Sequence, residues 1–101
     1  MNKEQIKQAI RKAIETDPNK KDILKVSLFG SHAYGNPDSN SDVDLLIEFN
    51  HGATVGFFKL ARIQRHFRES VGKKVDLLTP QAISKYFRDE VIAKSEQIYE
   101  K

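Results

Sequence analysis

One stretch of the chain, residues 27–49, constrains the possible fold more than any other. An apolar segment runs into Gly30-Ser31, ten mostly polar residues follow, and Asp42-Val43-Asp44 then opens a second apolar segment. Because alternate residues of a strand point to one face, the two carboxylates share a face and lie roughly 6.6 Å apart along the strand. Paired acids beside a Gly-Ser turn are a way to hold divalent metal ions against a nucleoside triphosphate.

Hydrophobic periodicity divides the rest of the chain into helices and strands. Apolar residues at every fourth position predict an amphipathic helix over residues 3–16, which Asp17-Pro18-Asn19 ends. The pattern then predicts strands over 23–29, 43–49 and 74–78, a loop over 31–41, a helix over 54–71 and a last helix that starts at Thr79-Pro80. Gly72 is expected to be a helix C-cap.

Helices over a short mixed sheet predict a single α/β (α+β) domain that spans residues 1–101. The helix over 54–71 is expected to bury Phe57 or Phe58, Leu60, Ala61, Ile63, Phe67 and Val71. The last helix is expected to bury Ile83, Phe87, Val91 and Ile92. The tail with Ile98 and Tyr99 is expected to continue this helix or to dock beside it.

The Gly-Ser turn followed by Asp-x-Asp resembles the signature of the polymerase-beta-like nucleotidyltransferase superfamily. The smallest members are the minimal nucleotidyltransferases, often antitoxins partnered with HEPN-domain proteins. The resemblance implies that Gly30 and Ser31 hold the β and γ phosphates and that Asp42 and Asp44 hold the metal. It also implies a third acid, Asp76 in KKVDLLT, which ligates a second metal and orients or deprotonates the attacking hydroxyl.

The implied activity is transfer of AMP from ATP to a hydroxyl group, with two Mg²⁺ ions as cofactors and with release of pyrophosphate. In the family the acceptor is a HEPN toxin, whose tyrosine receives AMP and which is thereby silenced. The resemblance therefore implies an antitoxin that acts on a HEPN-type partner protein, although a fold or a motif does not by itself fix a substrate.

One position departs from the family pattern and keeps alternatives open. Members often read Gly-Ser-x-Ala-Arg-Gly, whereas this chain has Tyr34 in place of the arginine, which removes a positive charge near phosphate. Tyr34 could stack on a base or serve as a loop anchor. The alternative functions are a non-catalytic module that neutralises or scaffolds a partner by contact, with a vestigial nucleotide site, and a nucleotide sensor.

Each motif residue also has an ordinary structural explanation. Gly30-Ser31 could be a simple strand-ending turn, Asp42 could cap a turn, and Asp76 could be an exposed acid at a sheet edge. Glu48 is expected at the surface or the sheet edge. His32 is expected at the surface of a turn, and the three histidines show no metal-ligand spacing.

The composition of the chain disfavours several classes of function. The formal charge of +3 is mild and does not favour direct nucleic-acid binding. Basic residues cluster at Arg62, Arg65, His66 and Arg68 and at 73–74. They form either a solvated helix face or a surface that faces a nucleotide or an acidic partner. No apolar run approaches the roughly 20 residues that cross a bilayer, and cysteine is absent. A cytoplasmic protein without a membrane segment is expected.

Overall fold

The fold is known from a computed structural model that describes residues 1–35 and 42–101. Its helices and strands, in chain order, are α1 (Lys3–Glu15), the 3₁₀ turn η1 (Lys20–Asp22), β1 (Ile23–Phe29), α2 (Ser31–Tyr34), β2 (Val43–Phe49), α3 (Phe57–Val71), β3 (Val75–Leu78), the 3₁₀ turn η2 (Pro80–Ala82), α4 (Lys85–Lys94) and β4 (Glu96–Glu100). None of the helices in the described ranges is long and apolar enough to cross a membrane.

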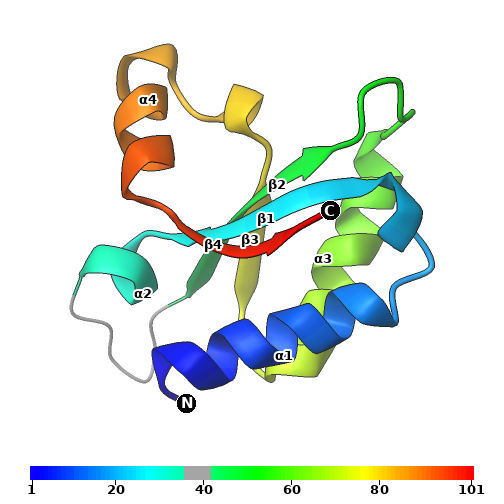
Figure 1. Ribbon diagram of the computed structural model, residues 1–101, viewed down its shortest axis with the longest axis horizontal. Coiled ribbons are helices and arrows are strands. Elements are labelled where there is room, and N and C mark those ends of the chain that lie inside the picture. The colour runs from blue at the N-terminus through cyan, green and yellow to red at the C-terminus, as the bar shows by residue number, and fades with distance from the viewer. Residues whose placement is uncertain (36–41) are drawn as a thin grey trace.

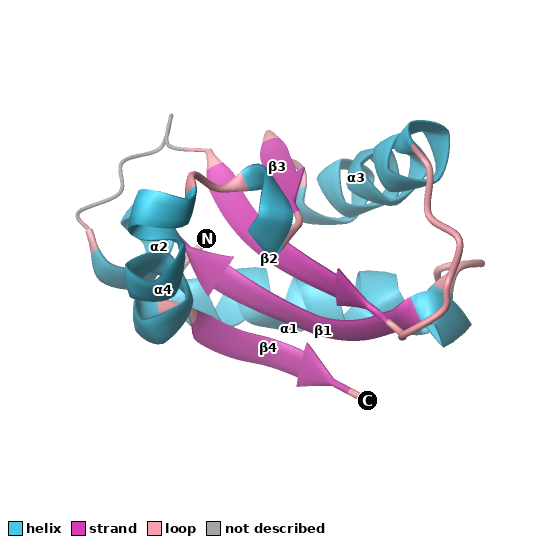
Figure 2. Cartoon of the chain, turned by 90° about the horizontal axis from the view of Figure 1, so that it is seen from above, coloured by secondary structure: helices cyan, strands magenta, loops and turns pink. Residues whose placement is uncertain are grey.

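The four strands form one mixed sheet in the order β3-β2-β1-β4. Strand β1 pairs antiparallel with both β2 and β4, whereas β2 pairs parallel with β3. Helices α1 and α3 cover one face of the sheet, and α2, η2 and α4 lie on the other side (Figures 1 and 2). This arrangement confirms the predicted small mixed sheet covered by helices.

The main core lies between the sheet and the α1–α3 layer. Alternate residues of β2 point into it, so Val43, Leu45 and Ile47 are fully buried. Residues four apart on α3, namely Ile63 and Phe67, meet them from the helix side. Because one face of β2 is committed to this core, its other face carries Asp44 and Glu48 towards the more open side of the sheet.

The chain after β3 differs from the prediction. The 3₁₀ turn η2 and the helix α4 are separate elements, because the Ser84 side chain accepts a hydrogen bond from the Tyr86 amide and starts a new helix. No residue of α4 is buried, and Phe87 is 61% exposed. The tail does not continue the last helix: it is strand β4, which pairs with the edge of β1 and buries Ile98 in the core.

Two further predictions about local structure were wrong. The first residues of the expected 31–41 loop form the short helix α2, while residues 36–41 of that loop lie outside the described part of the chain. Phe57 and Phe58 are 78% and 77% exposed and pack edge-to-face on each other, and Ala61 is also exposed. Apolar character alone does not tell at which turn a helix meets the core.

Ion pairs connect helix α1 to strand β4. The Lys3 ammonium contacts the Glu96 carboxylate at 2.7 Å, and the Lys7 ammonium contacts it at 3.3 Å. The hydrogen bond from Lys3 lowers the pKa of Glu96 below its ordinary value, partial burial opposes this, and Lys7 adds to the lowering. These contacts join residues at opposite ends of the sequence and hold β4 against the α1 side of the sheet.

We predict that Glu96→Gln lowers the free energy of unfolding at pH 7 by about 0.5–1 kcal/mol, the range for partly exposed ion pairs. Because the native pKa of Glu96 is lowered, its pairs stabilise the fold above the ordinary pKa of 4.5, and this contribution is lost as the pH falls through the native pKa. Urea unfolding at pH 7 and pH 3 measures both effects. Glu100→Gln, on the same strand, is the control; an equal loss in both variants would contradict the account.

Candidate functional site

The three predicted acids lie on one face of two neighbouring strands. Asp44 of β2 and Asp76 of β3 are direct partners in the parallel register. Asp42 precedes Asp44 by two residues and therefore points to the same side. All three side chains are partly exposed, so the structure brings the predicted acids together where solvent and ligands reach them.

The pKa of Asp44 reflects the closeness of the other two acids. Partial burial raises the pKa of Asp44 above its ordinary value, and the negative charges of Asp76 and then Asp42 raise it further, while His32 acts in the opposite sense. Like charges held close together disfavour ionisation. The three acids therefore form a concentration of negative charge that a cation would relieve.

Two basic residues lie close to Asp76 and Asp42, the outer two of the three acids. The guanidinium of Arg68, on α3, is 3.8 Å from the Asp76 carboxylate and also donates to the Val75 carbonyl at 3.0 Å. The ammonium of Lys74 is 3.6 Å from the Asp42 carboxylate. Of the basic cluster found in the sequence, Arg68 and Lys74 thus face the acids, whereas Arg62 and Arg65 are exposed. Sequence spacing could not show which members of the cluster point inward.

The acids fit a hard divalent cation such as Mg²⁺ by their chemistry, because carboxylate oxygens are its preferred protein ligands. No three His, Asp or Glu side chains within residues 1–35 and 42–101 are drawn together into a ready-made metal cage. The outer acids instead contact Lys74 and Arg68, and such partly exposed ion pairs are worth little free energy. A divalent cation that binds the acids would displace Lys74 and Arg68 at a small cost in free energy.

The Gly30 turn touches the central acid. Gly30 has a φ of +76° and a ψ of −153°, a region of backbone conformation that is essentially restricted to glycine. A Cβ atom at this position would overlap the Asp44 carboxylate oxygen Oδ2 and would lie 3.1 Å from its Cγ. Gly30 is therefore needed both for the turn and for the close approach between the turn and Asp44.

The residues after Gly30 form one turn of helix. Ser31 starts α2 and is partly exposed, and the Ala33 amide donates to the Gly30 carbonyl at 3.1 Å. His32 is only 6% exposed, so the expectation of a surface histidine was wrong. The helical turn explains the difference, because it directs His32 inward, where its charge affects Asp44. The side chain of Tyr34 lies outside what the structure describes.

Comparisons with known proteins show what the chain is similar to. Residues 8–101 match the family described as "Polymerase beta, Nucleotidyltransferase". The chain is similar to the proposed protein adenylyltransferase MJ0435 of Methanocaldococcus jannaschii, with 33% identity over 69% of this chain and 73% of that protein.

Two solved structures share the fold. One is a proposed minimal nucleotidyltransferase, with a TM-score of 0.74 and 28% identity over 98% of this chain and 96% of the other. The second is a complex of a tri-AMPylated HEPN toxin with an MNT antitoxin from Shewanella oneidensis. Its matching chain has a TM-score of 0.68 and 16% identity, over 98% of this chain and 73% of that chain. At this identity the second likeness concerns the fold alone.

We predict that Gly30→Ala lowers the free energy of unfolding by roughly 2–3 kcal/mol, because a side chain is strained in this backbone conformation and collides with Asp44. Gly72→Ala is the matched control: Gly72 has a similar φ of +74°, but no atom lies within 4 Å of an added Cβ. Its loss is expected near 1 kcal/mol, the cost of the left-handed conformation alone. Urea unfolding compares them, and equal losses would show that contact with Asp44 does not matter.

Proposed function

The chain belongs to the polymerase beta nucleotidyltransferase family and is a nucleotidyltransferase, and from that premise we propose that it transfers AMP from ATP to a hydroxyl group of a partner protein. The observation that carries this proposal is the pairing of Asp44 with Asp76 across parallel strands, with Asp42 on the same face. Three carboxylates on one face form the kind of oxygen-rich site that handles metal-bound phosphates.

Each site residue has a role in the proposed reaction. Asp42 and Asp44 would hold Mg²⁺, and Asp76 would complete the site for a second ion. The Gly30-Ser31 turn would hold the β and γ phosphates, which the contact between Gly30 and Asp44 supports because it sets the turn directly beside the acids. When bound, the Mg²⁺ ions would stabilise the attacking and leaving oxygens of an in-line displacement.

The proposed step is a substitution at the α-phosphorus. The acceptor hydroxyl oxygen forms a new bond to that phosphorus, and the bond to the bridging oxygen breaks, so that pyrophosphate leaves with the electron pair. Asp76 orients the hydroxyl and takes up its proton. Lys74 and Arg68, which lie 3.6 Å and 3.8 Å from Asp42 and Asp76, would balance part of the negative charge that the reacting phosphates bring to the site.

We further propose that the acceptor is a tyrosine of a HEPN-type toxin and that the chain acts as its antitoxin. The fold shared with a chain of the complex between an AMPylated HEPN toxin and an MNT antitoxin supports this assignment. The similarity to a proposed protein adenylyltransferase supports a protein as the acceptor and AMP as the transferred group.

We predict that Asp44→Asn abolishes AMP transfer, because a neutral amide is a poor replacement for a metal-binding carboxylate. The measurement is the intact mass of the partner protein after incubation with this chain, ATP and Mg²⁺: the wild type adds one or more AMP units and the variant adds none. Asp89→Asn, an exposed acid on α4, is the matched control and should transfer normally.

Folding of the Asp44→Asn variant is checked by urea unfolding at pH 7 without Mg²⁺. The variant should be at least as stable as the wild type, because burial and two neighbouring charges disfavour the ionised Asp44. A folded and fully active Asp44→Asn protein would refute the assignment of the metal site.

The alternative, a module that neutralises its partner by contact, makes a different prediction. Under that alternative the Asp42→Asn, Asp44→Asn double variant would inhibit the partner fully in the absence of ATP. Loss of inhibition in this variant, with retained binding to the partner, is the outcome that the transfer mechanism requires.

A further inference from the structure

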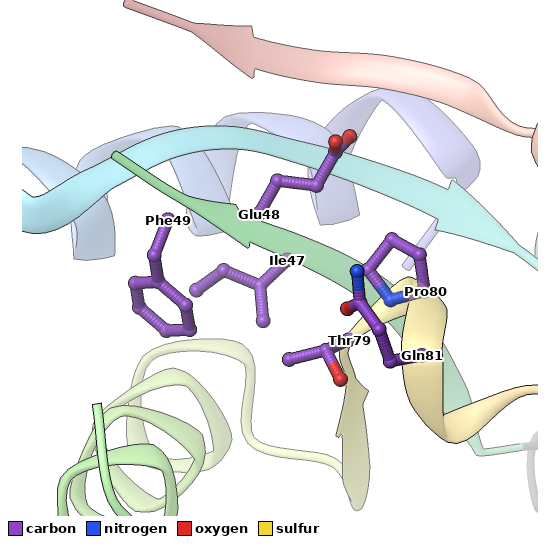
Figure 3. Close-up of a pocket in the computed structure, with 6 residues that line it drawn as sticks. All are labelled: Ile47, Glu48, Phe49, Thr79, Pro80 and Gln81. Atoms are coloured by element: carbon purple, nitrogen blue, oxygen red, sulfur yellow. The ribbon is translucent and has the colours of Figure 1, made fainter. Parts of the chain in front are cut away.

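Strand β3, which carries Asp76, is a short strand at the edge of the sheet. Its inner edge pairs with β2 along the four residues Val75–Leu78. Beyond Leu78 the two chains separate around a pocket of about 240 Å³, which residues 47–49 and 79–81 line (Figure 3). In the described part of the chain no strand pairs with the outer edge of β3. The strand that carries Asp76 therefore has little support from the sheet itself.

Helix α3 supplies side-chain partners for the outer edge of β3. The Lys74 carbonyl accepts from β2 at 2.9 Å, so the Val75 carbonyl and the Leu77 amide point to the opposite edge. The Leu77 amide donates to the side-chain oxygen Oε1 of Gln64 at 2.9 Å. The Nε of Arg68 donates to the Val75 carbonyl at 3.0 Å. The two side chains therefore take the place of a neighbouring strand.

The spacing of these two side chains matches the spacing of the strand. Gln64 and Arg68 are four residues apart on α3, which is about 6 Å along the helix axis. Val75 and Leu77 are two residues apart on β3, which is about 6.6 Å along the strand. The helix and the strand run in opposite directions, because the later helix residue bonds to the earlier strand residue. One turn of α3 thus fits one two-residue repeat of β3.

Asp76 lies between the two main-chain groups that α3 holds. The Val75 carbonyl precedes it and the Leu77 amide follows it, so its backbone is fixed on both sides. Arg68 also lies 3.8 Å from the Asp76 carboxylate, whereas Gln64 bonds to the main chain of Leu77. A change at Gln64 therefore alters the support of the strand without removing a charge beside the acids.

We propose that Gln64 is a positioning residue for Asp76, an inference that rests on the proposed function. Its hydrogen bond holds the Leu77 amide and thereby sets the direction in which the Asp76 carboxylate meets the acceptor hydroxyl. Misplacement of a reacting group by about 1 Å can cost about a hundredfold in rate. The proposed triphosphate site depends instead on the acids of β2 and on the Gly30 turn. Loss of the Gln64 bond therefore slows AMP transfer without weakening ATP binding.

Gln64→Met tests this role, because methionine resembles glutamine in length and helix propensity but lacks the amide oxygen. In AMP transfer to the partner protein, kcat should fall about tenfold or more, while the KM for ATP should change less than about twofold. Gln8→Met, at an exposed position of α1, is the matched control and should leave both constants unchanged. An unchanged kcat in Gln64→Met, or a raised KM for ATP with kcat retained, would overturn the proposal.

Rescue by a conservative variant separates positioning from a purely structural role. Gln64→Glu keeps a side-chain oxygen that accepts from the Leu77 amide, and its charge is favourable one helical turn before Arg68. This variant should restore most of kcat. Urea unfolding checks that each variant is folded under the assay conditions. If folded Gln64→Glu were as slow as folded Gln64→Met, the hydrogen bond would not be the cause and the proposal would fail.

The hydrogen bond itself is measured by NMR without ATP, Mg²⁺ or a partner. The Leu77 amide should be protected from hydrogen exchange in the wild type and in Gln64→Glu. In Gln64→Met it should exchange about tenfold faster or more, and the backbone signals of Asp76 should shift. Equal exchange of Leu77 in the wild type and in Gln64→Met would contradict the proposal.

The failure of this proposal and of the proposed function can be told apart. Faster Leu77 exchange and shifted Asp76 signals in Gln64→Met, in a protein whose wild type transfers no AMP, would leave the positioning by Gln64 intact and remove the proposed function. AMP transfer by Gln64→Met at the wild-type rate would remove the positioning role and leave the proposed function.

Discussion

The parallel pairing of β2 with β3 is the constraint on which the site depends. Its register places Asp44 directly beside Asp76. A slip of one residue would turn Asp76 to the opposite face of the sheet and would bring Val75 and Leu77 out of the core. The hydrophobic alternation of a four-residue strand therefore fixes the position of Asp76, since the register that buries the apolar side chains is the one that gathers the carboxylates.

The two faces of the sheet differ in character: one stabilises the fold, and the other carries the acids. The face towards α1 and α3 is a closed apolar core (Figure 1), whereas the other face carries three acids that repel one another. Aspartate is disfavoured in strands, so the acids lower the stability of the fold locally. The apolar core on the opposite face of the sheet must offset this loss. The Gly30 turn adds to this cost, because it holds an unusual backbone conformation against Asp44. Local rules of folding are broken mainly where ligands and chemistry are expected.

Much of this fold could be predicted from particular residues. The alternation in β1 and β2 gave strands with the observed bounds, and Gly72 caps α3 as expected, with its amide bonded to the Arg68 carbonyl at 2.8 Å. The shared face of Asp42 and Asp44 followed from their i, i+2 spacing, whereas Asp76 was implied by the resemblance to the nucleotidyltransferase superfamily.

The rest depends on contacts between distant residues. Whether the tail from Glu96 continues a helix or forms a strand is decided by the open edge of β1 and by Lys3 and Lys7, more than eighty residues earlier. The inward direction of His32 needs a helical turn that the loop-like composition of residues 31–41 does not indicate.

Isotopic labelling tests most directly whether the acids of β2 and β3 direct attack on the α-phosphorus of ATP. The partner protein from the neighbouring gene is incubated with this chain, Mg²⁺ and ATP labelled at either the α or the γ phosphate. The account predicts label on the partner from α-labelled ATP only, with pyrophosphate released in equal amount. Label from γ-labelled ATP, or a stable and inhibited complex without any label, would contradict it.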